Sequence, residues 1–60
     1  MEKDNIIDIL VSISNDTKNS IIASQAYNYA CTLEDMTQET YQQAKSFYLE
    51  FIIKYFNIIK

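Results

Sequence analysis

The strongest nucleophile in this sequence is Cys31, the single cysteine of the chain. A catalytic cysteine reacts as a thiolate, which a neighbouring base such as histidine usually generates and holds. The sequence contains no histidine. Because Cys31 falls near the apolar face of a helix expected over residues 20–33, we predict a buried structural cysteine at this position and no nucleophile.

The densest group of acidic side chains comprises Glu34, Asp35 and Glu39. Carboxylates at this spacing can hold a divalent cation or act as an acid–base pair. Their position at an expected turn and helix start has a simpler explanation, because acids there cap the helix and interact favourably with its dipole. One cysteine without histidine also makes a structural zinc site unfavourable. We therefore predict no catalytic residue, no metal and no cofactor.

The five tyrosines fall into two groups. The first group repeats every seven residues at Tyr41, Tyr48 and Tyr55, a spacing typical of a packing seam between helices. Tyr27 and Tyr29 are two positions apart and point to different sides of their helix, so at least one should be exposed. Because tyrosine is enriched in binding hot spots, an exposed tyrosine beside acids indicates a partner-binding surface.

The last third of the chain holds most of the apolar bulk, including all three phenylalanines. Its periodicity predicts a helix over about residues 37–59. The polar residues of this helix fall on one narrow stripe. They are Gln43, Ser46, Glu50, Lys54 and Asn57. The apolar side is wider than one partner helix can cover. We therefore expect this helix to contact at least two neighbours, one of which could belong to a second copy.

The apolar side of this last helix is the predicted partner or dimer interface. Its residues are Tyr41, Phe47, Tyr48, Phe51, Ile52, Tyr55, Phe56 and Ile59.

The first half of the chain leaves two structural alternatives open. Residues 5–14 fit a helix with Asp4 as N-cap, although their β-branched residues also alternate as in a strand; the helix is favoured because no second strand is evident. The polar segment 15–20 either separates two helices or lies inside one long helix over residues 4–33. A clearer boundary lies at residues 32–40, where Asp35 or Thr37 can cap the last helix and Met36 can form a hydrophobic staple.

Length, composition and charge restrict the functional class. Sixty residues form one domain, 1–60, and the absence of Gly and Pro favours helices joined by polar turns. Residues 1–40 carry seven acids and two Lys (net −5), and residues 41–60 carry three Lys and one Glu (net +2), which sum to −3. Five Lys and no Arg argue against nucleic-acid binding, and eight acids are few for a DNA mimic.

Residues 46–59 are interrupted too often by charged and polar residues for a membrane span. No basic signal-peptide start is present, so a cytoplasmic protein is expected.

Together these features predict an all-α protein of two or three helices, a helical hairpin or small bundle. A chain this short buries little surface, so we expect homodimerisation to complete the bundle. The predicted function is a non-enzymatic protein–protein interaction module, a small regulator or inhibitor that docks on a larger protein. The size and composition are also typical of phage or mobile-element proteins. The alternatives are a structural homo-oligomerisation module and a membrane-surface-active helical peptide.

Overall fold

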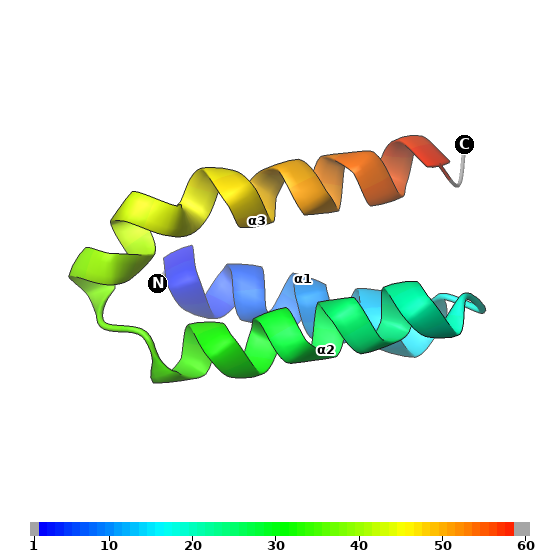
Figure 1. Ribbon diagram of the computed structural model, residues 1–60, viewed down its shortest axis with the longest axis horizontal. Coiled ribbons are helices and arrows are strands. Elements are labelled where there is room, and N and C mark those ends of the chain that lie inside the picture. Colours follow the sequence, from blue (N-terminus) through cyan, green and yellow to red (C-terminus); the bar gives the residue numbers. More distant parts are fainter. Residues whose placement is uncertain (1, 59–60) are drawn as a thin grey trace.

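A computed structural model describes residues 2–58 of the chain. It contains three helices, α1 (Glu2–Asp16), α2 (Ser20–Asp35) and α3 (Gln38–Ile58), and no strand within these residues. Figure 1 shows that α1 and α3 run in the same direction and that α2 runs in the opposite one. The all-α prediction is confirmed, and residues 5–14 form a helix rather than a strand.

The polar segment after α1 is a turn, so the alternative of one helix over residues 4–33 is wrong. α1 ends at Asp16, and the backbone of Asn19, directly before α2, is extended (φ −85°, ψ 112°). The Asn19 side-chain oxygen accepts hydrogen bonds from the backbone N–H groups of Ile21 (2.9 Å) and Ile22 (3.2 Å). These two N–H groups belong to the first turn of α2 and have no partner inside the helix. Asn19 therefore starts a new helix by satisfying them.

Replacing Asn19 by alanine is expected to lower the free energy of unfolding by about 1 kcal/mol, a typical loss for a helix N-cap. Urea denaturation followed by circular dichroism measures this change. The control is Asn15→Ala, since Asn15 is exposed inside α1 and alanine is the better helix former there. An equal loss in both variants would show that the Asn19 cap contributes nothing specific.

The other helix starts show one corrected and one confirmed prediction. Asp4 is not the N-cap of the first helix, because α1 already begins at Glu2 and Asp4 lies within its first turn. A carboxylate is also favourable there, next to the positive end of the helix dipole. Thr37 caps α3 as predicted, with its hydroxyl oxygen accepting a hydrogen bond from the Thr40 N–H at 3.2 Å. Asp35 is instead the last residue of α2.

The loop between α2 and α3 is held to the start of α1. Met36 has an extended backbone (φ −77°, ψ 143°) and packs partly buried against the core. Its carbonyl oxygen accepts a hydrogen bond of 2.7 Å from the Lys3 ammonium group. The Glu2 carboxylate lies 3.7 Å from the Lys45 ammonium group of α3. These contacts fix the three helices together at one end of the bundle.

One hydrophobic core lies between the three helices. It is formed by Ile6, Ile7, Leu10, Ile13, Ala26, Ala30, Leu33, Tyr41, Tyr48, Ile52 and Tyr55. The predicted seam of Tyr41, Tyr48 and Tyr55 is thus buried. Of the other two tyrosines at least one was expected to be exposed, and Tyr27 is 59% accessible. The last helix contacts both other helices of its own chain. Its Lys45 pairs with Glu2 of α1, and its Tyr48 ring packs against the ring of Tyr29 of α2.

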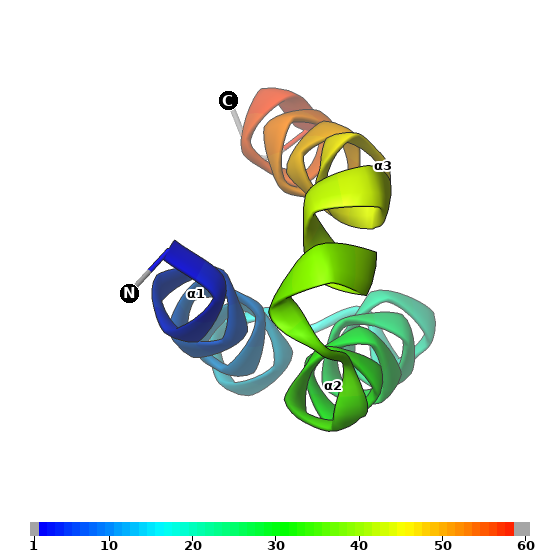
Figure 2. The same ribbon diagram turned by 90° about the vertical axis from the view of Figure 1, so that its left-hand side faces the viewer.

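The helices are not equally spaced. The backbones of α1 and α2 approach each other closely, because α2 presents the small residues Ala26 and Ala30 to the core. The third helix presents tyrosines and stands farther off, as the end-on view in Figure 2 shows. The large side chains of α3 therefore fill the space between this helix and the other two. Any space that they do not fill lies along the sides of α3.

The prediction that Cys31 is buried is wrong, because its side chain is exposed. The core face of α2 is centred on Ala26 and Ala30. Cys31 follows Ala26 by five positions, which is about 140° around the helix at 100° per residue. It therefore lies beyond the edge of the apolar face on which the sequence pattern placed it.

Candidate functional site

The surface of the described residues carries seven exposed large hydrophobic side chains, on all three helices. They are Ile9, Val11, Ile21, Tyr27, Phe47, Ile53 and Phe56. Single exposed apolar residues are ordinary, whereas apolar residues gathered around a hollow indicate an interaction site. Ile9 and Phe56 line one hollow together, whereas Tyr27 and Phe47 each line a separate, smaller one.

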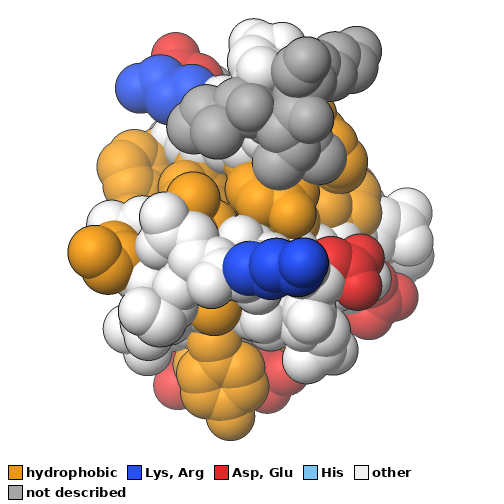
Figure 3. Space-filling model, turned by 90° about the vertical axis from the view of Figure 1, so that its right-hand side faces the viewer, with side chains coloured by type: hydrophobic (Ala, Val, Ile, Leu, Met, Phe, Trp, Pro, Cys, Tyr) orange, Lys and Arg blue, Asp and Glu red, His pale blue; other side chains and the backbone are white. Residues whose placement is uncertain are grey.

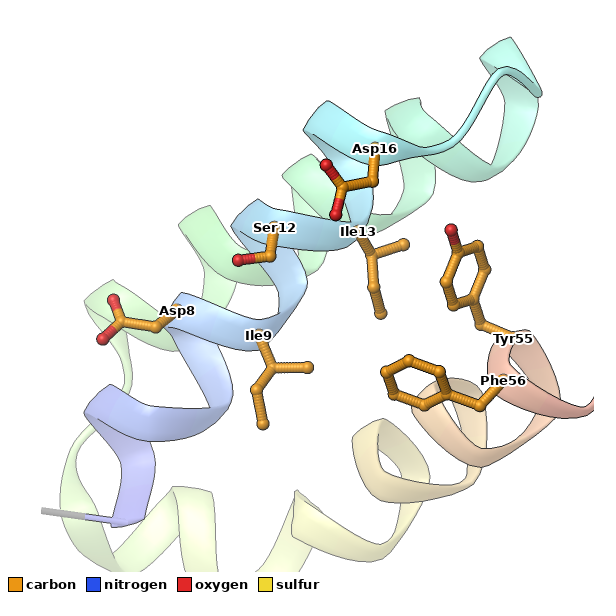
Figure 4. Close-up of a pocket in the computed structure, with 7 residues that line it drawn as sticks. All are labelled: Asp8, Ile9, Ser12, Ile13, Asp16, Tyr55 and Phe56. Carbon is orange, nitrogen blue, oxygen red and sulfur yellow. The ribbon is translucent and has the colours of Figure 1, made fainter. Parts of the chain in front are cut away.

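This hollow is a groove of about 510 Å³ between α1 and the C-terminal part of α3. Its lining residues are Asp8, Ile9, Ser12, Ile13, Asp16, Tyr55 and Phe56. Figure 4 shows Ile9 and Ile13 pointing from α1 toward the rings of Tyr55 and Phe56 on α3. Ile13 and Tyr55 are buried, whereas Ile9 is 36% and Phe56 is 45% accessible. The floor of the groove therefore belongs to the core, and its walls remain partly unpacked.

The groove follows from the spacing of the helices. Tyr55 fills the space between α3 and the core, and this large ring holds the backbone of α3 away from α1. Near the start of α1 the gap is bridged by Glu2 and Lys45. No ion pair within residues 2–57 bridges the other end, where α1 finishes at Asp16. The lining residues Asp16 and Phe56 place the groove toward the end of the bundle that carries the α1–α2 turn.

Figure 3 views this end of the bundle directly. Hydrophobic side chains form a band across it, and both acidic and Lys side chains lie beside the band. Exposed apolar surface and charges of both signs thus occur together on this face of the molecule.

The α1 side of the groove carries the negative charge. Asp8, Ser12 and Asp16 recur every four residues and form a polar stripe beside Ile9 and Ile13. Within residues 2–57 the one ion pair joins Glu2 to Lys45, so neither Asp8 nor Asp16 has a cationic partner there. The helix α1 contains four acids and one Lys, a net charge of −3. The groove is therefore apolar inside and acidic along one edge.

A second apolar surface, between α2 and α3, is already packed by its own side chains. The ring of Tyr29 makes edge-to-face contacts with the rings of Phe47, Tyr48 and Phe51, with centroid distances of 5.4, 5.5 and 5.1 Å. Such contacts stabilise the pairing of two helices. The hollows beside this cluster are about 220 and 200 Å³, less than half the size of the groove. This surface holds the fold together and leaves less room for a partner.

The residues of the predicted interface are divided among three places. Four of them are in the core of the chain itself: Tyr41, Tyr48, Ile52 and Tyr55. Phe47 and Phe51 belong to the aromatic cluster with Tyr29. Phe56 lines the groove, and Ile59 lies outside the described residues. Among the described residues of that predicted set, Phe56 and Phe47 are the exposed ones.

The α1 half of the groove was not anticipated from the sequence. The signal that could have indicated it is the polar stripe of Asp8, Ser12 and Asp16 next to Ile9 and Ile13. Such a pattern places an apolar line and an acidic line side by side on one helix. It does not reveal whether another helix covers the apolar line.

The acidic and thiol side chains within residues 2–58 are dispersed. No group of three or more His, Cys, Asp or Glu residues in this range could hold a metal ion. None of the helices in this range is long and apolar enough to cross a membrane. The two pKa values that shift are those of Tyr41 and Tyr48, both raised mainly by burial. Both tyrosines belong to the core, so these shifts reflect packing.

Comparisons of this chain with family models, with curated proteins and with solved structures found no match.

Proposed function

We propose that this chain is a non-enzymatic protein–protein interaction module that docks on a larger partner. The groove between α1 and α3 carries this proposal. It combines half-exposed apolar walls, Ile9 and Phe56, with a preformed hollow of about 510 Å³. Binding sites are typically concave and mostly apolar, with a few polar groups at the edge. A small regulator or inhibitor acts by presenting such a surface to its target.

The test is an affinity pull-down of the tagged protein from a lysate of its own source, read by mass spectrometry. The informative variant is Ile9→Asp/Phe56→Asp, which places charges on the walls of the groove. One stoichiometric partner should be recovered with the wild-type protein and lost with this variant. Circular dichroism must show that the variant remains folded. Substituting Tyr55 would be uninformative, because this side chain is buried and its loss would unfold the protein.

The matched control is Ile21→Asp, which places a charge on an exposed hydrophobic side chain of α2 that lines neither the groove nor the other hollows. This variant should retain the partner. Retention of the partner by Ile9→Asp/Phe56→Asp would place the docking surface elsewhere, and loss of the partner in both variants would show that the effect is not specific to the groove. Recovery of the wild-type protein alone would contradict the proposal and favour a structural module that binds only itself.

The second candidate function is homo-oligomerisation, with a dimer that completes a larger bundle. It is favoured by Ile53, an exposed residue of α3 that lines neither the groove nor the hollows beside the aromatic cluster. A second copy could cover such a side chain. Sedimentation over a range of concentrations distinguishes this candidate, since a dimer made through Ile53 should dissociate in Ile53→Asp.

A further inference from the structure

We propose that the groove between α1 and α3 binds a basic amphipathic helix of a partner protein, aligned antiparallel to both helices. This inference rests on the proposed function and specifies the chemistry of the partner. Three features of the groove support it: the direction of the helices that flank it, the distribution of charge along it and the unfavourable position of one of its acids.

The direction of the helices leaves one bundle position open. The order α1, α2, α3 is up, down, up, and α1 and α3 are parallel neighbours across the groove. A fourth helix that runs down between them would complete an antiparallel four-helix bundle. Its dipole would also oppose those of its two neighbours, which is favourable. A hollow of about 510 Å³ is filled by a few large side chains, so the partner helix would lie along it with its apolar face inward.

The charge along the groove selects a basic partner. Asp8 and Asp16 flank the apolar walls on the α1 side, and no cation within residues 2–57 pairs with either. Lys or Arg residues beside the apolar face of a partner helix would lie opposite these carboxylates. Complementary charge of this kind fixes the register and speeds association. An acidic helix or an anionic membrane surface would be repelled by the same edge.

The same charges disfavour a second copy of this chain as the occupant. A two-fold dimer brings the same patch of both copies together. The carboxylates of Asp8 and Asp16 from both copies would then be gathered in one partly apolar interface. Like charges placed opposite each other are destabilising, so the groove is better suited to a different, basic chain.

Asp16 is unfavourable for the stability of α1 itself. It is the last residue of the helix, and no basic residue lies in that turn. A carboxylate at this end interacts unfavourably with the negative end of the helix dipole. A cation of a bound partner beside Asp16 would offset this unfavourable interaction. The last turn of α2 carries the same conflict at Asp35, which lies outside the groove and therefore provides a matched control.

The experiment uses two fluorescent peptides of about 18 residues, whose helical length of about 27 Å is close to the 32 Å of the bundle. Both peptides carry the same leucine stripe; one has Lys and the other has Glu at every flanking position. Fluorescence anisotropy measures their binding to the full chain at about 50 mM and about 300 mM salt, where the screening length differs. We expect the Lys peptide to bind at least about tenfold more tightly than the Glu peptide, and less tightly at high salt.

The charge variants make this result specific to the groove. In Asp8→Asn/Asp16→Asn the Lys peptide should bind about 3–10-fold more weakly, as two exposed ion pairs allow. The control Glu34→Gln/Asp35→Asn removes the same charge from α2 and should bind like the wild-type protein. Ser12→Lys, a change at an exposed position that leaves the core intact, should weaken the Lys peptide further.

Each other outcome overturns the inference in a distinguishable way. Equal binding of both peptides, lost in Ile9→Asp/Phe56→Asp, would retain the groove as a docking site and exclude the basic partner. Equal weakening by the groove and control charge variants would show a non-specific attraction to net charge. Binding of neither peptide would exclude an amphipathic helix, whereas the pull-down would still decide whether a partner protein exists. A dimer that dissociates in Ile9→Asp/Phe56→Asp would identify a second copy as the occupant.

Discussion

Replacement of Leu10 by alanine is expected to lower the free energy of unfolding by about 2–5 kcal/mol. Leu10 is fully buried at 0% accessibility in the core between the helices. Truncating such a leucine removes buried apolar surface and leaves a cavity, and both effects destabilise the fold. A domain of 60 residues has a total stability of only about 3–9 kcal/mol. The variant should therefore lose a large fraction of its stability, which urea denaturation followed by circular dichroism measures.

Val11→Ala is the control for this prediction. Val11 is the next residue of α1 and is 36% accessible, so its truncation leaves no closed cavity and should cost less than about 1 kcal/mol. Similar losses in the two variants would show that Leu10 is not a core residue in solution. The three-helix arrangement would then need revision.

The second large effect is expected at Tyr41, with opposite signs for two substitutions. Tyr41 is fully buried, and Tyr41→Ala should cost about 3–5 kcal/mol, as for other large aromatic side chains. Its hydroxyl group makes no hydrogen bond within the described residues. Tyr41→Phe keeps the ring and removes this unpaired polar group, so it should raise the stability by about 1 kcal/mol. Thermal unfolding of both variants measures the two changes.

The pH dependence of unfolding supplies an independent check on Tyr41. Burial and then the negative charge of Glu2 raise its pKa above the usual 10.0. The folded state therefore holds the proton more tightly than the unfolded state, and the stability that this provides is present below pH 10.0 and lost as the pH rises above it. Tyr41→Phe should lose less stability above pH 10.0 than the wild-type protein. A decline as steep as in the wild-type protein would show that Tyr41 does not contribute.

The helices could largely be predicted from the sequence, because their signals are local. The heptad spacing of Tyr41, Tyr48 and Tyr55 indicates one buried line whatever the partner is. The cap at Thr37 follows from its place before a periodic segment. The break at residues 15–20 could not be decided from its spacing, since the same apolar line continues through it. The hydrogen bonds of the Asn19 side chain to α2 decide it in favour of a turn.

The groove could not be predicted, because it depends on the distances between helices. The sequence indicates that α3 has more apolar surface than one helix can cover, but not which part of it the chain buries by itself. The structure assigns Tyr48 and Ile52 to the core and leaves Phe56 exposed. The difference arises from packing: Ala26 and Ala30 let α1 and α2 come together, while the tyrosines keep α3 apart.

The exposed thiol of Cys31 has a practical consequence for these experiments. It is the single cysteine of the chain, and it lies on α2, which does not line the groove. In air, two copies can join through it, and the resulting covalent dimer would imitate the assembly that sedimentation is meant to detect. Measurements of oligomeric state therefore require a reductant or Cys31→Ser. The same thiol is a suitable attachment point for a single fluorophore, which would report on partner binding without occupying the groove.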